Sequence, residues 1–183
     1  MKVLNTKLPG VLVVETAPLV DQRGAFARWF CEKELGAIMA RRHIAQVNYS
    51  RTSRAGALRG FHYQHAPHAE MKLIRCINGR VFDVAVDLRH GSTTFLRWHA
   101  EELTPANGRM LVIPEGCAHG FQAMEAGSDL LYLHTALYAP DAEGGVRFDE
   151  PRIGVSWPMP VVDLSQRDNS FPVLDAGFSG ILV

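Results

Sequence analysis

The segment MKLIRCINGRVFDVAVDL, residues 71–88, consists of two alternating apolar runs separated by Asn78-Gly79. Successive side chains of a strand point to opposite faces, so runs of this length and pattern are typical of β-strands. Asn-Gly favours a type I′ turn, because both of its central residues need positive φ. We therefore predict two strands in this segment, joined as a β-hairpin.

Strand parity places polar side chains among apolar ones on single faces of the predicted strands. The sets that share a face are Lys72, Ile74 and Cys76; Val81, Asp83, Ala85 and Asp87; and Leu130, Tyr132, His134 and Tyr138. Buried polar groups are costly unless they have partners, so such faces indicate a cavity rather than a dry core.

The rest of the chain consists mainly of short apolar runs broken by turn residues, and only EKELGAIMARR, residues 32–42, has a helical pattern. Many short strands with one helix predict an antiparallel sandwich or small barrel of jelly-roll type. We expect a single domain over residues 1–183, with the tail after Trp157 wrapped over the surface.

Composition narrows the class of protein. The 183 residues include 19 basic and 19 acidic side chains, and 47% are hydrophobic. Balanced charge argues against a nucleic acid or an anionic membrane as the main partner. No apolar stretch has the length of a signal peptide or a membrane span. Cys31, Cys76 and Cys117 form no C-x-x-C pair, so we expect reduced thiols and a cytoplasmic protein.

The segment PEGCAHGF, residues 114–121, contains a P-x-G-x-x-H motif formed by Pro114, Gly116 and His119. It resembles the second of two motifs of the cupin family, whose fold is a β-barrel. Metal-binding cupins usually have a glutamate where this chain has Lys72, and a histidine where it has Ala66. An ammonium group opposes the binding of a divalent cation, so we predict no metal and no other cofactor.

Three histidines, His62, His65 and His68, precede Lys72 at intervals of three residues. This spacing alternates between the faces of a strand, which argues against a shared metal site. We expect His65 and His68 to be exposed loop residues beside Pro67. His62 lies within a predicted strand, and we expect Lys72 to reach the same cavity from the neighbouring strand.

His62, Lys72 and Tyr132 have the chemistry needed to move a proton next to a carbonyl group. A neutral imidazole is a suitable general base, and an ammonium group stabilises a developing enolate oxygen. A tyrosine on the opposite side can act as the acid. Together these residues predict proton removal α to a carbonyl and proton return from the other face.

The chain resembles the dTDP-4-dehydrorhamnose 3,5-epimerase family nearly from end to end. The segments that carry the resemblance are DQRGAF, QVNYSR, GALRGFHYQ, HAEMKLIRCINGRVFDVAVDLRHGSTTF, IPEGCAHGF, LYLHTALYAPDAEGG and SQRDNSFP. The resemblance implies an all-β, cupin-type jelly-roll barrel with one or two short helices. It also implies a metal-free homodimer that acts on a nucleotide-linked 4-keto-6-deoxy sugar.

The resemblance assigns catalytic roles to four positions. His62 matches the base, Tyr132 the acid, and Lys72 the lysine near the keto oxygen. Asp168 matches the aspartate that orients the base, although Ser165-x-x-Asp168 is also a helix-capping pattern. A second histidine–aspartate pair near the substrate is matched by His119 and its supporting residue Asp83.

The family's substrate-binding positions are matched as well. Arg23 and Arg59 correspond to the residues that bind the diphosphate, which suits bidentate guanidinium groups. The nucleotide- or sugar-contacting positions correspond to Phe26, Gln46, Asn48, Tyr138, Glu143 and Arg167. Arg28 stands where thymidine-specific members have a glutamate, so a GDP- or CDP-linked substrate, epimerised at carbon 3 alone, is the alternative.

Two further functions remain open from the sequence. One is a metal-dependent cupin oxygenase or isomerase that uses His62, His68, His119 and Glu70. The other is a sugar-nucleotide binding protein without catalysis, which the set of His62 and its partners disfavours. We interpret Cys117, two residues before His119, as a small buried thiol rather than a nucleophile.

Overall fold

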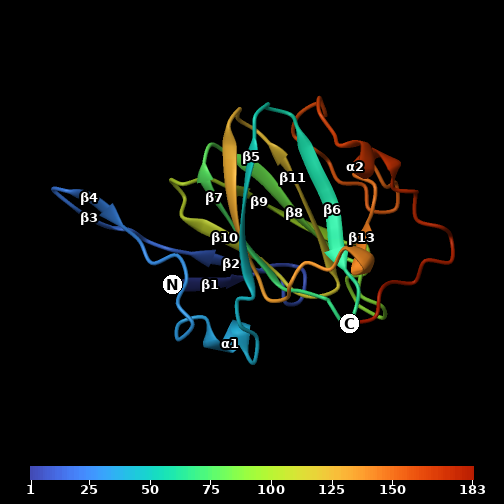
Figure 1. Ribbon diagram of the computed structural model, residues 1–183, viewed down its shortest axis with the longest axis horizontal. Coiled ribbons are helices and arrows are strands. Elements are labelled where there is room, and N and C mark those ends of the chain that lie inside the picture. The colour runs from blue at the N-terminus through green and yellow to red at the C-terminus, as the bar shows by residue number, and fades with distance from the viewer.

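The computed structural model describes residues 1–183 and consists of two antiparallel sheets packed face to face (Figure 1). The six-stranded sheet has the order β1 (Lys2–Asn5), β2 (Leu12–Glu15), β10 (Arg109–Ile113), β7 (Lys72–Asn78), β12 (Ser128–His134), β5 (Gln46–Thr52). The five-stranded sheet has the order β13 (Glu143–Gly145), β6 (Leu58–Gln64), β11 (Cys117–Ala123), β8 (Val81–Asp87), β9 (Trp98–Leu103).

The chain alternates between the two sheets. From β5 to β13, each strand is followed by a strand of the other sheet, except that β9 pairs with its predecessor β8. This crossing pattern in an antiparallel sandwich is that of a jelly roll. The predicted all-β, cupin-type fold with short helices is therefore confirmed.

The predicted hairpin at Asn78-Gly79 is wrong, although the turn exists. β7 pairs with β10 and β12, whereas β8 pairs with β11 and β9, so this turn passes from one sheet to the other. Gly79 has φ of +74°, and a Cβ there would lie 2.5 Å from Ser128 Oγ. Asn78 Nδ2 donates to Gly127 O at 2.8 Å. The dipeptide thus allows a tight turn that packs against Gly127 and Ser128. The partners of the two strands, in contrast, are determined by long-range pairing.

The interior between the sheets follows the predicted parity. Ile74, Cys76 and Leu130 belong to one buried apolar cluster, and Tyr132 packs against it. Lys72 lies on the same face of β7 and is 7% exposed. Alternation along β7 and β12 therefore leads from an apolar core to a polar cavity within the same sheet.

The outer face of the five-stranded sheet is covered by the C-terminal tail, as expected from the sequence. Val84, Val86 and Leu88 point outward from β8 and the residues after it, and they pack in one cluster with Ile181 and Trp157. The tail also contains α2 (Gln166–Ser170), which brings Asp168 next to β6.

The helix predicted over residues 32–42 is shorter than expected: α1 spans only Gly36–Met39. Leu35 precedes it without a capping side chain, and Ala40 ends it with φ of +51°. Leu35 and Met39 are buried against the outer face of the six-stranded sheet. The apolar pattern thus reflects packing on the sheet, but the uncapped ends limit the helix to about one turn.

The short hairpin of β3 (Leu19–Asp21) and β4 (Gly24–Phe26) extends away from the sandwich (Figure 1). Leu19 and Val20 are each 75% exposed, and Phe26 is 67% exposed. A 3₁₀ helix, η1 (Pro140–Ala142), precedes β13. No helix has both the length and the hydropathy needed to cross a membrane.

Candidate active site

A cavity of about 750 Å³ opens between the two sheets and contains most of the predicted site residues. His62 on β6 and His119 on β11 line it from the five-stranded sheet. Lys72 on β7 and Tyr132 on β12 line it from the six-stranded sheet. Asp168 enters from α2. The cavity therefore has two chemically distinct walls.

His62 is held by a buried carboxylate. Its Nε2 lies 2.8 Å from Asp168 Oδ1, while the Gly60 N–H donates to Asp168 Oδ2 at 3.0 Å. Burial alone would raise the pKa of Asp168, but hydrogen bonds from His62 and Gly60 outweigh it and lower that pKa to about 2. Asp168 is therefore ionised, and its carboxylate accepts Nε2–H from His62.

This hydrogen bond leaves Nδ1 of His62 as the basic nitrogen. Arg167 Nη2 lies 2.9 Å from the same Nε2, but Arg167 has better acceptors in Glu143 Oε2, at 2.8 Å, and in Asp168 Oδ1. A guanidinium group only donates, so it cannot share an already protonated Nε2. Asp168 thus fixes the tautomer of His62, and Arg167 anchors the carboxylate side of the pair.

Ser165 and Gly60 explain how Asp168 reaches this position. Ser165 caps α2 by accepting from the Asp168 N–H at 3.0 Å, so the capping pattern is real. Because that bond uses the backbone of Asp168, its side chain remains free to bind His62. At Gly60 a Cβ would lie 2.5 Å from Gly120 Cα, so only glycine allows β6 to approach β11 this closely.

His119 forms a second histidine–aspartate pair deeper in the same wall. Its Nε2 lies 2.7 Å from Asp83 Oδ1, and both side chains are buried. Burial lowers the pKa of His119, although Asp83 opposes that effect. His119 is therefore a neutral hydrogen-bonding group at physiological pH, which fits contact with a sugar.

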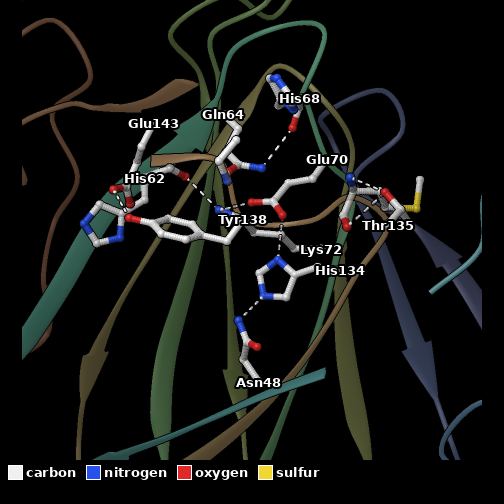
Figure 2. A network of polar contacts seen from close by, with 12 residues as sticks. Asn48, His62, Gln64, His68, Glu70, Lys72, His134, Thr135, Tyr138 and Glu143 are labelled. Carbon is white, nitrogen blue, oxygen red and sulfur yellow. Dashed lines mark hydrogen bonds and ion pairs between the residues drawn. The ribbon is translucent and has the colours of Figure 1, made fainter. Parts of the chain in front are cut away.

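Lys72 lies on the opposite wall, where Nζ donates to the backbone oxygen of His62 at 3.1 Å (Figure 2). Glu70 Oε1 is 3.4 Å from the same nitrogen. Burial lowers the pKa of Lys72, and the negative charge of Glu70 is the strongest opposing influence. Lys72 is thus a buried amine paired with a carboxylate at the surface of a cavity, and in its protonated form such a group stabilises a developing oxyanion.

Tyr132 also lies on the wall formed by the six-stranded sheet. Its hydroxyl group is 3.2 Å from Ser50 Oγ, and its ring packs edge-on against His119 with centroids 5.9 Å apart. Burial raises the pKa of Tyr132. The phenol is therefore fully protonated at neutral pH and suited to donate a proton.

Besides His119, six of the predicted binding residues line the cavity: Gln46, Asn48, Arg59, Tyr138, Glu143 and Arg167. Gln46 Oε1 accepts from the Tyr138 N–H at 2.8 Å, and the Tyr138 hydroxyl group donates to Glu143 Oε2 at 3.2 Å. These contacts form a polar rim near His62.

Three predicted binding residues lie outside this cavity. Arg23 and Phe26 are on the β3–β4 hairpin, where Arg23 pairs with Asp21. Arg28 pairs with Glu34 at 2.8 Å. Sequence resemblance assigned these residues to the site without indicating that Arg23 and Phe26 lie on a projecting hairpin and that Arg28 follows it.

Several residues of the cavity were not among the catalytic or binding residues predicted for the epimerase, and Glu70 was predicted only as a ligand in the metal-dependent alternative. Glu70 bonds to His134 through Oε2 and Nδ1 at 2.7 Å, and both line the cavity next to Lys72 (Figure 2). Parity had placed His134 on the face of Tyr132, which was the available signal, but nothing linked it to Glu70 across 64 positions. Arg51 and Arg54 also line the cavity and add positive charge.

Of the groups in the metal-dependent alternative, His62 and His119 bind aspartates. His65 and His68 are exposed, as predicted, and Glu70 pairs with Lys72 and His134. No group of three or more histidine, cysteine, aspartate or glutamate side chains has a metal-binding arrangement. Cys117 is a buried thiol, and burial raises its pKa to about 12, as expected for a structural cysteine.

Comparison with known proteins gives one consistent answer. The profile of the family described as dTDP-4-dehydrorhamnose 3,5-epimerase matches residues 5–176. An enzyme of that name from Salmonella typhimurium is 38% identical over 177 residues, covering 96% of this chain and 96% of the relative. One from Sinorhizobium fredii is 41% identical over 155 residues, covering 84% and 80%.

Solved structures agree with the sequence relatives. The dTDP-6-deoxy-D-glucose-3,5-epimerase of Legionella pneumophila, in complex with dTDP-4-keto-L-rhamnose, aligns with a TM-score of 0.91 and 34% identity. The alignment covers 100% of this chain and 98% of that one.

Proposed function

The chain belongs to the dTDP-4-dehydrorhamnose 3,5-epimerase family, and from this membership we propose how its cavity performs the reaction. The enzyme is an isomerase of dTDP-linked 4-keto-6-deoxy sugars. The 4-keto group acidifies the protons on carbons 3 and 5. Each inversion then requires removal of one proton, stabilisation of an enolate, and return of a proton to the opposite face.

His62 removes the proton through Nδ1. Its Nε2–H is committed to Asp168 at 2.8 Å, which supports Nδ1 as the free base. The ionised carboxylate also stabilises the imidazolium that forms when the proton arrives. Asp168 is thus the positioning residue of the base.

Lys72 stabilises the enolate oxygen, and Tyr132 returns the proton. The observation that carries this proposal is that base and acid come from opposite sheets, His62 from β6 and Tyr132 from β12. A sugar ring between these walls has one face toward each of them. Proton removal on one side and return on the other inverts the carbon.

Arginines and polar side chains at the cavity mouth bind the nucleotide diphosphate. Arg59 and Arg167 supply guanidinium groups that suit phosphate oxygens. Gln46 and Asn48 from β5 and Glu143 from β13 contact the sugar or the base, and Tyr138 offers a ring for stacking. His119, supported by Asp83, hydrogen-bonds the sugar.

The enzyme acts as a homodimer in which the β3–β4 hairpin of each chain reaches the cavity of its partner. Leu19, Val20 and Phe26 expose apolar surface on this hairpin, which supports burial against another chain. Arg23 would then complete the diphosphate site. Light scattering would give the mass of a dimer, and mixing inactive His62→Ala and Arg23→Ala chains would restore activity in mixed dimers.

All 183 residues form one catalytic domain, and the enzyme works in the cytoplasm. The free state of Cys31, Cys76 and Cys117 supports a reducing compartment. Cell fractionation with an antibody to the chain would test this location.

Proton NMR in heavy water tests the reaction directly, with dTDP-, GDP- and CDP-linked 4-keto-6-deoxy sugars as substrates. We expect the signals of the protons on carbons 3 and 5 to disappear as deuterium replaces them, and to disappear fastest for the dTDP-linked sugar. Loss at carbon 3 alone would identify a 3-epimerase. Faster exchange with the GDP- or CDP-linked sugar would show that the enzyme prefers a base other than thymine. No exchange with any of the sugars would refute the proposed function.

A further inference from the structure

Glu70 and His134 form a buried pair that the proposed reaction leaves without a role. The Glu70 side chain is 7% exposed and that of His134 is 11% exposed. His134 Nδ1 lies 2.7 Å from Glu70 Oε2. A buried carboxylate is costly unless both oxygens have partners. Oε2 binds His134 Nδ1, and Oε1 lies 3.4 Å from Lys72 Nζ. The carboxylate thus links His134 to the cation of the site.

The hydrogen-bond partners determine the state of His134. Glu70 is ionised, because His134 and Lys72 outweigh burial and leave its pKa below the usual value. An ionised carboxylate only accepts, so Nδ1 of His134 carries the proton. Its Nε2 can then accept from Asn48 Nδ2 at 3.4 Å. Asn48 therefore donates to His134, His134 donates to Glu70, and Glu70 pairs with Lys72, so the four side chains form one continuous network (Figure 2).

Lys72 needs this network for both direction and charge. One of its three N–H donors goes to His62 O at 3.1 Å, and Glu70 attracts the ammonium on a second side. A donor therefore remains for the cavity. Burial favours the neutral amine, which could not stabilise an enolate oxygen by charge. Glu70 is the nearest negative charge that opposes this effect.

The other charged and titratable groups around Lys72 come from every neighbouring strand. Glu143 and Asp83 also favour its charged form, and they lie on β13 and β8. The histidines of the cavity are His62 on β6, His119 on β11 and His134 on β12. Among these groups only Glu70 forms an ion pair with Lys72.

We propose that Glu70, held by His134, is a positioning residue that keeps Lys72 protonated and directed at the oxygen of the enolate. The proposal rests on the function proposed above, in which Lys72 stabilises that oxygen. Because the reaction needs the protonated amine, the rate falls as pH rises through the pKa of Lys72. Removing the charge of Glu70 lowers that pKa further, so the alkaline loss of activity moves to lower pH.

The test compares pH profiles of kcat for wild type, Glu70→Gln and a matched control, Glu101→Gln. Glu101 on β9 has the same kinds of partners outside the cavity, with His99 and Arg109 each at 2.9 Å. We expect the alkaline limb of Glu70→Gln to shift by about 1 to 3 pH units toward acid, the usual effect of one close opposite charge. The profile of Glu101→Gln should match wild type.

Coincident limbs for wild type and Glu70→Gln, or equal shifts in both variants, would overturn the proposal. If wild type exchanges no proton at all, the proposed function fails instead, so the two failures are distinguishable. If Glu70→Gln does not fold, two substitutions at His134 test the proposal instead. We expect His134→Leu to lower kcat about tenfold or more and His134→Gln, whose amide can donate to Glu70, to restore most of it. Equal rates for the two His134 variants would overturn the proposal.

Discussion

The two walls of the cavity have the same backbone construction but opposite chemistry. The wall from β6, β11 and β8 carries two histidines, each bound to an aspartate at 2.7 to 2.8 Å. The wall from β7 and β12 carries a buried lysine paired with Glu70 and a protonated phenol. A jelly roll places consecutive strands in opposite sheets, so it can separate proton removal from proton return across one substrate.

The largest effect is expected on the histidine wall. His62→Asn removes the base while keeping a polar side chain of similar reach, so exchange at carbon 3 should fall by about 10²- to 10⁴-fold. Binding of dTDP should remain near that of wild type, because the substitution removes no diphosphate contact. Proton NMR in heavy water and calorimetry give the two values.

His68→Asn is the matched control for this change, because His68 is exposed on the loop after the same strand. It should exchange at the wild-type rate. A folded His62→Asn enzyme with full exchange would show that the base lies elsewhere.

On the opposite wall, Lys72→Met keeps the length of the side chain but removes its charge. The loss of one group that stabilises an oxyanion reduces kcat by about 10²- to 10³-fold. Steady-state kinetics should show the effect in kcat rather than in KM. A change confined to KM would mean that Lys72 binds the substrate without acting on the enolate.

Tyr132→Phe separates the functions of the two walls, because it removes the hydroxyl group of one wall and leaves His62 on the other. Exchange of the proton by His62 should persist, while inversion falls by about 10²-fold because the opposite wall no longer donates. The ratio of exchanged to inverted product, read from one NMR time course, measures this separation. Equal losses of exchange and inversion would place both steps on one side of the sugar.

Much of this division was predictable from the alternation of side chains. Parity grouped Lys72 with Ile74 and Tyr132 with His134, and both groups face the interior. The roles of His62 and Asp168, in contrast, came from resemblance, because their contact spans 106 positions. Local pattern gives the face of a strand, but not what lies across from it.

The wrong prediction of a hairpin and the contact that the sequence did not predict have the same origin. Asn78-Gly79 correctly indicated a turn, yet a dipeptide cannot specify that β7 pairs with β10 and β12 instead of β8. The Glu70–His134 contact depends on the same long-range pairing, because β12 lies beside β7 in register His134 to Lys72. Such contacts follow from sheet order, which composition and periodicity do not determine.

The smallest effect concerns stability. The pKa of Asp168 is lowered from 3.8 to about 2, so its ionisation contributes about 2 kcal/mol above pH 4 and this contribution is lost as pH falls toward 2. Asp168→Asn should therefore lower the free energy of unfolding at pH 7, with a smaller difference at pH 3. Urea unfolding at both pH values measures this.

Asp163→Asn is the control, because Asp163 is exposed five residues earlier in the same tail. It should leave the unfolding free energy unchanged at both pH values. A difference between wild type and Asp168→Asn that stays constant from pH 7 to pH 3 would contradict an ionised, stabilising carboxylate.

The arrangement of the two walls is tested most directly by a crystal structure with a dTDP-linked 6-deoxy sugar that has a hydroxyl group at carbon 4 and therefore cannot form an enolate. We predict that the sugar ring lies between the sheets. His62 Nδ1 should be about 3 to 3.5 Å from carbon 3, on the face of the ring that carries the hydrogen of carbon 3. Tyr132 should face the opposite side of the ring, and Lys72 should contact the oxygen on carbon 4. A ring with His62 and Tyr132 on the same face would contradict the account.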